Sequence, residues 1–535
     1  MALPAPVLDD AFHYTSGRWL YNESKRLAER HVSFDMHSLM RAAAASVNRS
    51  YEDINSVRKV AEGGFNRVFE LTMKDGFQLI ARIPYASAQP KHLATASEVA
   101  TMALVRSHGV PVPQVYTYSA DPGNAAGCDY IIMEKAHGRC LGDIWFEMSD
   151  KDRVRLLGDI ADYEAKLSQI CLPAFGSVYY EQDLPVAFKR IRIENQPLRC
   201  CIGPDVSLKN WFGSRESLDI PRGPAFTAAE IYTNVANREL AWLRAHGKPR
   251  MPFEREYREM FNYDRVDPEE HVKTLQNFVK VAAHLVPSED WQLKPTLRHP
   301  DLNPNNIFVN DACSIVSIID WQHVVALPLF LAAGIPGSLQ NYGDPESEEL
   351  RKPEFPQNLD QMDPDDQQKD LELYRRRHAH FYYIGATAVN FNTHYKALAA
   401  DRGLFRKKLY HHAAAPWEGN SIPLKAALVQ AVRSWQDITR QRSDSSQNCP
   451  ISFSGAEAED IMSKMVEQEH MDSNMSILRD ILGISSDGWV SYERYKDAAA
   501  EAAAMKEQAM KCAEDEHERE MTDKHWPFQD FDEEE

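Results

Sequence analysis

Apolar positions in the first third of the chain recur at two spacings, one typical of strands and one typical of helices. Three strands are predicted over 56–61, 67–73 and 78–84. Lys74-Asp75-Gly76 has the composition of a hairpin turn between the second and third of them. Residues 91–108 then follow helical spacing, Gly109 ends that helix, and another strand is predicted over 130–133. This order predicts a small sheet interrupted by one helix.

Helical spacing dominates the rest of the chain. Further helices are predicted over 17–47, 150–170, 270–286, 366–403, 424–441, 455–482 and 491–514. Two short strands are predicted at 307–309 and 315–319, and residues 343–365, rich in Pro, Asp and Glu, are predicted to form a loop. Residues 176–270 show no clear period, so no element is assigned there. The acidic residues 514–535 are expected to form a solvated tail.

Composition narrows the kinds of partner. The chain has 535 residues, with 60 basic against 79 acidic side chains and a net charge of −19, which argues against nucleic-acid and anionic-membrane binding. No apolar run approaches the roughly 18 residues of a membrane span. Eight cysteines without metal-site spacing are typical of a reducing, intracellular compartment. Residues 1–16 contain Asp9 and Asp10 but no Lys or Arg, unlike a presequence.

Candidate chemistry is concentrated in one loop and the strand pair that follows it. His299 precedes Asp301 by two residues, Asn306 follows Asp301 by five, and Asp320 ends the second strand. A carboxylate that accepts a hydroxyl proton, followed by an amide oxygen and a second carboxylate for Mg²⁺, is the set that nucleotide-dependent phosphoryl transfer needs. We expect His299 to fix the loop by hydrogen-bonding main chain. The alternative is a loop whose Asn and Asp side chains only cap turns.

The stretches His299–Val309 and Ile318–Trp321 resemble the motifs of the aminoglycoside phosphotransferase/choline kinase family. The resemblance extends over about residues 55–340 and implies an α/β (α+β), protein-kinase-like fold with a small N-terminal sheet lobe and a larger helical C-terminal lobe. It also implies ATP or GTP and Mg²⁺ as cofactors, with Asp301 as catalytic base beside His299 and with Asn306 and Asp320 as metal ligands. Trp321 stands where protein kinases carry Phe, which favours the small-molecule branch.

The resemblance also assigns phosphate-binding residues upstream. Gly63, Gly64 and Asn66 follow the first strand, where the family has a nucleotide-positioning turn. Arg82 stands in the place of the kinase lysine, and Glu98 on the next helix is its expected ion-pair partner. The alternatives are an ordinary hairpin turn and an exposed Arg at the end of a strand.

Residues 131–135 and Gly138 resemble the hinge between kinase lobes. By this resemblance, main-chain groups near Glu134 and Ala136 would hydrogen-bond the adenine. An apolar strand end is equally consistent with packing alone.

Between the hinge and the catalytic loop, residues 176–270 exceed what a minimal lobe requires and would carry acceptor-binding elements. Candidates for an aromatic and basic pocket are Trp211, Phe212, Arg215, Arg222 and Trp242. Such residues more often belong to the core and to the solvated surface, and we favour that interpretation.

Additional stretches, including Tyr14–Leu20, Phe175–Tyr179 and Ile319–His323, are similar to the fungal altered-inheritance-of-mitochondria phosphotransferase-like proteins. This similarity implies a mitochondrial location, whereas the acidic start of the chain leaves a cytoplasmic one open. It supplies no physiological substrate.

The resulting division is 1–54 as N-terminal extension, 55–136 as nucleotide-binding lobe, 137–442 as catalytic lobe, 443–513 as helical extension and 514–535 as acidic tail. The predicted reaction moves a γ-phosphate to a hydroxyl of a small molecule. The alternatives are a non-catalytic nucleotide-binding regulator and, less favoured, a protein kinase. The oligomeric state is not predicted.

Overall fold

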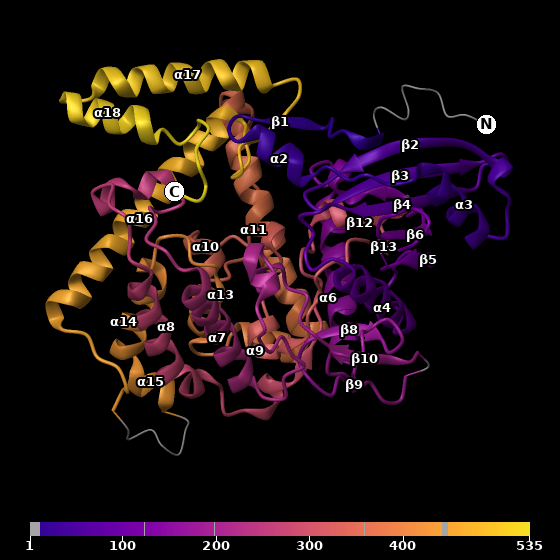
Figure 1. Ribbon diagram of the computed structural model, residues 1–535, viewed down its shortest axis with the longest axis horizontal. Helices are drawn as coiled ribbons and strands as arrows, with labels where there is room; N and C mark the ends of the chain where they lie inside the picture. The colour runs from indigo at the N-terminus through magenta and orange to yellow at the C-terminus, as the bar shows by residue number, and fades with distance from the viewer. Residues whose placement is uncertain (1–10, 122, 197, 358, 441–447) are drawn as a thin grey trace.

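The computed structural model describes residues 11–121, 123–196, 198–357, 359–440 and 448–535. Asp9, Asp10 and residues 441–447 lie outside the described residues. The described chain forms a sheet lobe, at the right of Figure 1, and a larger helical lobe. Within the described ranges, no helix is long and apolar enough to cross a membrane.

The smaller lobe is built on a five-stranded antiparallel sheet in the order β2-β3-β4-β6-β5. Its strands are β2 (Ile54–Glu62), β3 (Asn66–Met73), β4 (Gln78–Pro84), β5 (Val115–Ser119) and β6 (Tyr130–Glu134). The four strands predicted here are confirmed. The edge strand β5 was not predicted, because all five of its residues are half-buried and show no alternation.

Helices cover the sheet from two sides. α3 (Met36–Ser46) packs with Phe69 and Ile132 in one apolar cluster. Ile131 and Met133 point the other way and join the core that contains α4 (Leu93–Ser107). Because successive strand residues face opposite sides, one short strand supplies both clusters.

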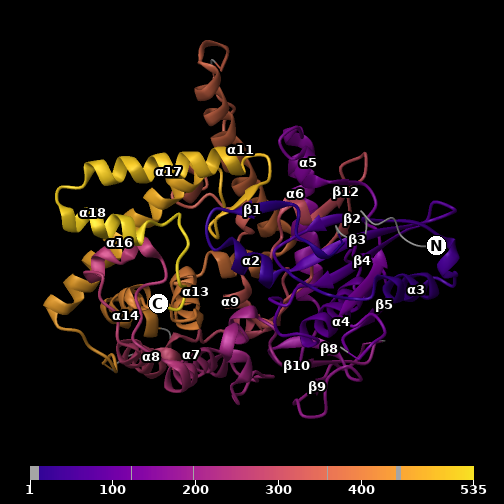
Figure 2. The ribbon, with the colours of Figure 1, turned by 45° about the horizontal axis from the view of Figure 1, so that its top comes forward.

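The core around α4 continues into the larger lobe. It includes residues of α6 (Asp150–Ser168), of α11 (Pro364–Asn390), and of β12 (Ile307–Val309) and β13 (Ile315–Ile318). β12 and β13 form a sheet with β7 (Arg139–Cys140) in the order β13-β12-β7. The N-terminal part of α11 projects from the body of the molecule (Figure 2). Both lobes therefore share one hydrophobic core beside the candidate loop.

Residues 176–270, which carried no assigned element, contain a small sheet and one long helix. The elements are β8 (Ser177–Tyr180), β9 (Ile191–Arg192), β10 (Cys200–Gly203) and α7 (Ala228–His246). α8 (Pro268–Ala282) follows close to its predicted place. The remaining short elements of this lobe are α5 (Leu141–Ile144), β11 (Pro295–Thr296), β14 (Leu327–Pro328) and α9 (Leu329–Ala332).

The helices after residue 340 differ in detail from those predicted. The predicted loop 343–365 contains α10 (Pro345–Glu348), and the predicted helix 366–403 breaks at Phe391 into α11 and α12 (Asn392–Leu398). α13 (Gly403–Ala414) was not predicted. The other helices are α14 (Ile422–Arg433), α15 (Trp435–Thr439), α16 (Gly455–Leu482) and α17 (Tyr495–Cys512). α7, α8, α13 and α14 share a second core.

Residues 17–29 lie against the C-terminal residues 489–535, which corrects two predictions. Residues 17–47 are not one helix: β1 (Gly17–Trp19) precedes α2 (Glu23–Glu29) and α3, and pairs with β15 (Trp489–Ser491). Nor is the acidic end a solvated tail. It contains α18 (Glu516–His525), and the side chain of Glu533 is only 10% exposed beside α2. Figure 1 shows these C-terminal helices in yellow above β1 and α2.

Candidate functional site

The loop between β11 and β12 holds Asp301 in a fixed geometry. The Asn303 side chain donates from Nδ2 to Asp301 Oδ2 (2.8 Å) and accepts from the Asn305 N–H (2.8 Å). Asn306 Nδ2 donates to the main-chain oxygen of Asp301 (2.8 Å). Oδ1 of the exposed Asp301 carboxylate has no hydrogen-bond partner among the described residues. One carboxylate oxygen is therefore anchored while the other is left open.

His299 connects this loop to the end of β13. Its Nδ1 accepts from the Asp301 N–H (3.2 Å), so its Nε2–H donates to the carbonyl oxygen of Ile319 (2.8 Å). Burial lowers the pKa of His299, which favours the neutral ring that both hydrogen bonds require. His299 thus orients Asp301 by holding main chain rather than by facing the open side of the site.

Asp320 is positioned through the residue before it. The Ile319 N–H donates to the Asn306 carbonyl (2.9 Å), and the Ile319 carbonyl accepts from His299. Asp320 itself adopts a left-handed backbone conformation with φ of 66°, and its side chain is 41% exposed. Two hydrogen bonds to one peptide segment therefore bring Asp301, Asn306 and Asp320 to the same end of the β12–β13 hairpin.

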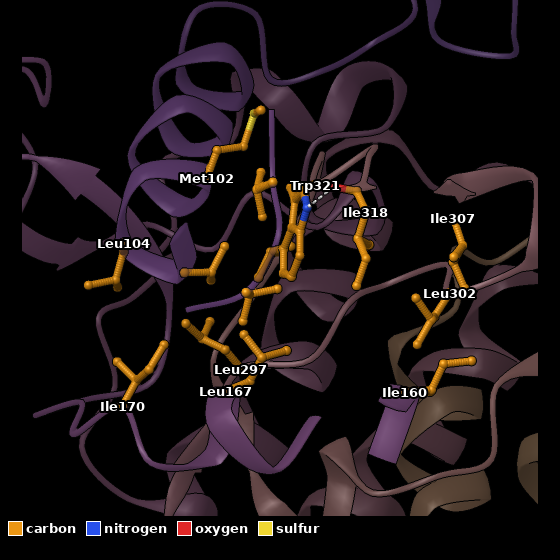
Figure 3. Close-up of a cluster of buried hydrophobic side chains, with 14 of the residues drawn as sticks. Met102, Leu104, Ile160, Leu167, Ile170, Leu297, Leu302, Ile307, Ile318 and Trp321 are labelled. Carbon is orange, nitrogen blue, oxygen red and sulfur yellow. Dashed lines mark hydrogen bonds between the residues drawn. The ribbon is translucent and has the colours of Figure 1, made fainter. Parts of the chain in front are cut away.

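Trp321 anchors this segment in the shared core. Its indole is 1% exposed and donates from Nε1 to the Ile318 carbonyl (2.9 Å). Figure 3 shows the ring between Met102 of α4 and Ile318 of β13. Its edge meets the His299 ring at 4.8 Å between centroids. A large buried side chain directly after Asp320 restricts where that carboxylate can lie.

The donor set fits Mg²⁺. Asn306 uses its Nδ2 inside the loop, which leaves Oδ1 free, and Asp320 Oδ2 has no hydrogen bond among the described residues. No group of three or more His, Cys, Asp or Glu side chains in the described ranges has metal-site geometry. Mg²⁺ does not need one, because it commonly takes one or two protein oxygens and completes its shell with phosphates and water.

Arg82 lies in the middle of the sheet and reaches the same place. β4 pairs it with Val68 on one side and Ile131 on the other. Its guanidinium forms an ion pair with Glu98 of α4 and a second one with Asp320 (3.2 Å). Arg82 is only 7% exposed, so the alternative of an exposed strand-end arginine is wrong. Burial raises the pKa of Glu98 to about 7, with Arg82 opposing the shift and Asp320 adding to it.

The glycine turn joins β2 to β3 above this site. The Gly63 N–H donates to the Asn66 carbonyl (3.0 Å), and a Cβ at Gly64 would meet no protein atom within 4 Å. Asn66 Nδ2 donates to Gln322 Oε1 (2.8 Å), which links the turn to the segment after Trp321. Gln322 was not predicted as a site residue, although it directly follows the Asp-Trp pair. The turn is open, with space at Gly64 that the protein itself does not fill.

The predicted hinge runs from the end of β6 to β7. The Glu134 N–H donates to the Gln114 carbonyl (2.8 Å), and the Ala136 N–H has no partner among the described residues. Gly138 has φ of 90°, and a Cβ there would lie 2.3 Å from the carbonyl oxygen of Val309. The chain that leaves the hinge at Gly138 therefore packs directly against β12, beside the candidate loop.

A cavity of about 310 Å³ opens beside Asp301. Its walls come from the catalytic loop, from the segment between His323 and Gly337, and from α13. Among the described residues of 176–270, Ser207 alone lines it. Lys407 and His411 of α13 line it as well. None of these three was predicted. Lys407 and His411 lie far from the motif in sequence and belong to a helix that periodicity did not reveal.

The five residues considered for an aromatic and basic pocket in 176–270 do not divide into buried aromatic and exposed basic side chains, as the favoured core-and-surface interpretation expects. Trp211 is 5% exposed, whereas Phe212 is 50% exposed. Arg215 pairs with Glu239 in the interior. None of Trp211, Phe212, Arg215, Arg222 and Trp242 lines the cavity beside Asp301.

A phosphotransferase enzyme family model matches residues 56–330, a range that includes the glycine turn, Arg82, the loop with Asp301, and Asp320. The chain belongs to this family. A subtelomeric hrmA-associated cluster protein of Aspergillus fumigatus is 31% identical over 511 residues, covering 89% of this chain and 96% of that protein. Altered inheritance of mitochondria protein 9 of Kluyveromyces lactis is 22% identical, covering 84% of this chain and 83% of that protein.

Membership confirms the family resemblance, and relatives of the mitochondrial-inheritance group confirm the second resemblance. The two lobes of this phosphotransferase are those of the protein-kinase-like fold, with the small antiparallel sheet and larger helical lobe expected from the sequence. A solved gentamicin complex of APH(2″)-IIa covers 76% of this chain and 99% of its own, at 12% identity and a TM-score of 0.36. Its TM-score and sequence identity are too low to add to the family assignment.

Proposed function

We propose that this phosphotransferase moves the γ-phosphate of ATP or GTP to a hydroxyl group of a small molecule. The observation that carries the proposal is the joint fixing of Asp301 and Asp320. His299 and Asn306 hold the Ile319 peptide from two sides, while Asp301, whose Oδ1 has no hydrogen bond among the described residues, lines a cavity of about 310 Å³. A loop that only capped turns would not need its carboxylate held open beside a cavity.

In this reaction the acceptor hydroxyl lies in the cavity. Asp301 orients it and takes its proton through Oδ1, while Asn303 keeps Oδ2 in place. Asn306 and Asp320 would hold Mg²⁺, which neutralises charge on the phosphates during transfer. The remaining contribution is alignment, because a well-oriented pair of reactants loses much of its entropic barrier.

Arg82 and the glycine turn are the proposed grip on the phosphates. The Arg82 guanidinium already reaches Asp320, so a phosphate near Asp320 lies within its range. The open space at Gly64 lets main-chain N–H groups approach phosphate oxygens. The main-chain N–H of Ala136, two residues after Glu134, has no partner among the described residues. It is the proposed hydrogen-bond donor to the nucleobase of ATP or GTP.

A non-catalytic nucleotide-binding regulator remains the second candidate, because Arg82 replaces the usual lysine and the turn has only two glycines. A protein kinase is less favoured on a structural ground. The chain passes within a few residues from Asp320 to β14, which pairs with β11, and then enters α9. This leaves little room for a loop that would bind a peptide substrate.

Thermal unfolding with ATP or GTP, with and without Mg²⁺, tests nucleotide binding directly. A Mg²⁺-dependent rise in Tm is expected for the parent and a smaller rise for Asp320→Ala. ADP or GDP release with a panel of hydroxylated metabolites then separates an enzyme from a regulator. Absence of any nucleotide effect on Tm contradicts the proposal, whereas binding without turnover for every acceptor favours the regulator.

The location proposed is intracellular. The relatives of the mitochondrial-inheritance group carry the word mitochondrial in their names, which supports a mitochondrial site over a cytoplasmic one. Fractionation of cells that express a C-terminally tagged chain tests this, with recovery in the cytosol alone counting against it.

A further inference from the structure

The cavity beside Asp301 has an uneven charge. Asp301 is the single carboxylate among its described lining residues, and it faces two cationic side chains, Arg298 and Lys407. The histidines His299, His323 and His411 complete the polar wall. A pocket built to hold an ammonium group needs carboxylates in addition to the base, because buried charges require partners. This wall offers positive groups instead.

Of the two cations, Arg298 is already neutralised. Its guanidinium forms an ion pair with Glu164, which is 3% exposed, and donates to the Ala332 carbonyl (3.0 Å). Glu164 is held in turn by the Tyr383 hydroxyl (2.6 Å). Arg298 therefore has a structural role in the cavity wall, and its charge is not available to a ligand.

Lys407 is different. Its Nζ donates to the Ala333 carbonyl (2.7 Å), and no described carboxylate forms an ion pair with it. Burial lowers the pKa of Lys407 to about 8, and the neighbouring Arg298 adds to the shift. An ammonium has three N–H donors, and only one is bound to the protein. The remaining donors and an uncompensated charge are available at the cavity.

The main chain opposite makes room for this ammonium. A Cβ at Gly334 would lie 2.8 Å from Lys407 Nζ, closer than real side-chain carbons approach, and at an ordinary contact distance of 3.5 Å from Arg298 Nη1. Gly334 lines the same cavity. Because Gly334 has no side chain, the Lys407 ammonium can lie against the cavity wall. A buried cation without a counter-charge disfavours folding, and an anion bound in the cavity would supply that counter-charge.

We propose that the acceptor is a small hydroxylated anion, whose carboxylate or phosphate binds Lys407 while its hydroxyl faces Asp301. This rests on the proposed phosphoryl transfer and specifies its substrate class. The acceptor oxygen bonds to the γ-phosphorus, the bond from that phosphorus to the bridging oxygen of the nucleoside diphosphate breaks, and the acceptor proton passes to Asp301. A volume of about 310 Å³ limits the acceptor to a small metabolite, and Leu331 and Ile335 offer its carbon chain apolar contacts.

The test uses two anions that differ in their charged group, glycerate and glycerol 3-phosphate, with glycerol and choline as neutral and cationic counterparts. Calorimetric titration of the full chain without nucleotide measures acceptor binding alone. Thermal unfolding with Mg²⁺–ATP measures nucleotide binding, so failure of the phosphoryl-transfer proposal is recognised separately. ADP release then measures transfer to each bound compound.

Lys407→Met removes the charge at similar length, Lys407→Arg keeps it, and Lys408→Met removes the exposed neighbouring charge on the same helix. At least one anion is expected to bind the parent, with Kd weakened about tenfold or more in Lys407→Met and little changed in Lys408→Met. Partial retention in Lys407→Arg shows that charge rather than folding is responsible. The proposal is overturned if neither anion binds, if glycerol or choline binds as tightly, or if Lys407→Met binds anions like the parent.

Discussion

At the scale of single residues, the two carboxylates of the site are held in different ways. Asp301 is fixed by side-chain amides of its own loop, Asn303 above all. Asp320 is fixed through the peptide group before it and by the ion pair with Arg82. This difference fits their proposed roles. Asp301, as the base, needs one open oxygen, whereas Asp320, as a metal ligand, would exchange its contact with Arg82 for one with Mg²⁺. His299 supports both through one ring.

His299→Phe tests that support. Phenylalanine keeps the edge contact with Trp321 but removes the hydrogen bonds to Ile319 and to the Asp301 N–H. We expect kcat to fall by about 10–100-fold, since small displacements of a base are costly, with the Kd of Mg²⁺–ATP little changed. Steady-state kinetics and calorimetry on the same preparation measure the two effects. Unchanged kcat would show that the loop holds Asp301 without the ring.

Lys407 predicts a pH dependence. Its lowered pKa of about 8 means that it is charged below that pH and loses its charge as the pH rises through it. Arg298 keeps its charge in this range, and the pKa values of the facing histidines His394 and His411 are lowered, by burial and then by nearby cations. Lys407 is therefore the group that titrates near pH 8. The KM for an anionic acceptor should rise above this pH.

The measurement compares pH 7 with pH 9.5 for glycerate, whose carboxylate stays ionised throughout. About a thirtyfold rise in KM is expected for the parent, because affinity follows the charged fraction of Lys407. Lys407→Arg should give a flat profile, since arginine keeps its proton. A rise of equal size in that variant would assign the pH effect to another group.

At the scale of elements, the hinge and the catalytic hairpin depend on one close contact. Gly138→Ala would place a Cβ 2.3 Å from the Val309 carbonyl at a residue whose φ is 90°. Both the clash and the left-handed backbone disfavour alanine, so we expect the free energy of unfolding to fall by about 1–3 kcal/mol. Nucleotide affinity should fall with it, because the hinge moves away from β12.

Urea unfolding with Gly158→Ala as the control measures this effect. Gly158 lies within α6, and a Cβ there meets no atom within 4 Å, so alanine is expected to be neutral or stabilising. Equal stability of Gly138→Ala and the parent would show that the hinge can shift without loss.

The elements also show what the sequence made predictable. The strands β2 to β4, which follow one another through short turns, and capped amphipathic helices such as α6 and α16 were predicted because local chemistry determines them. β5 and α13 were not, since neither shows a clear apolar period. The motif around Asp301 could be found because its residues are near in sequence. Lys407 could not, because it joins the cavity only through tertiary packing.

At the scale of the whole molecule, residues 17–29 and the C-terminal residues 489–535 form one structure. Tyr21 shares a hydrophobic cluster with Val490, Ala498 and Phe528, and β1 pairs with β15. The N-terminal segment continues to the glycine turn, where Glu62 accepts from the Thr15 N–H (2.8 Å) and the Ser16 hydroxyl (3.0 Å). The C-terminal end is therefore connected, through the N-terminal segment, to the residue beside Gly63.

Glu533 is the main polar contact in this connection. Its carboxylate accepts from Asn22 Nδ2 (2.8 Å), Lys25 (2.6 Å) and Arg26 (2.5 Å), and its side chain is 10% exposed. Glu533→Gln keeps the shape but leaves Lys25 without its counter-charge and removes one of the two carboxylates paired with Arg26. We expect the free energy of unfolding to fall by about 1–2 kcal/mol and the C-terminal segment to become more sensitive to protease.

Glu534→Gln is the matched control. The Glu534 carboxylate is next in sequence to Glu533, but its side chain is 80% exposed and it lies 3.6 Å from Lys248 at the surface. We expect a change of less than about 0.5 kcal/mol there. Urea unfolding and timed proteolysis of both variants, at 0.05 M and 0.5 M NaCl, measure the difference. Because the Glu533 contacts are shielded from salt, the gap between the variants should persist at the higher concentration. If both variants unfold alike, the acidic end contributes by packing of Phe528 and its neighbours rather than by this cluster of charges.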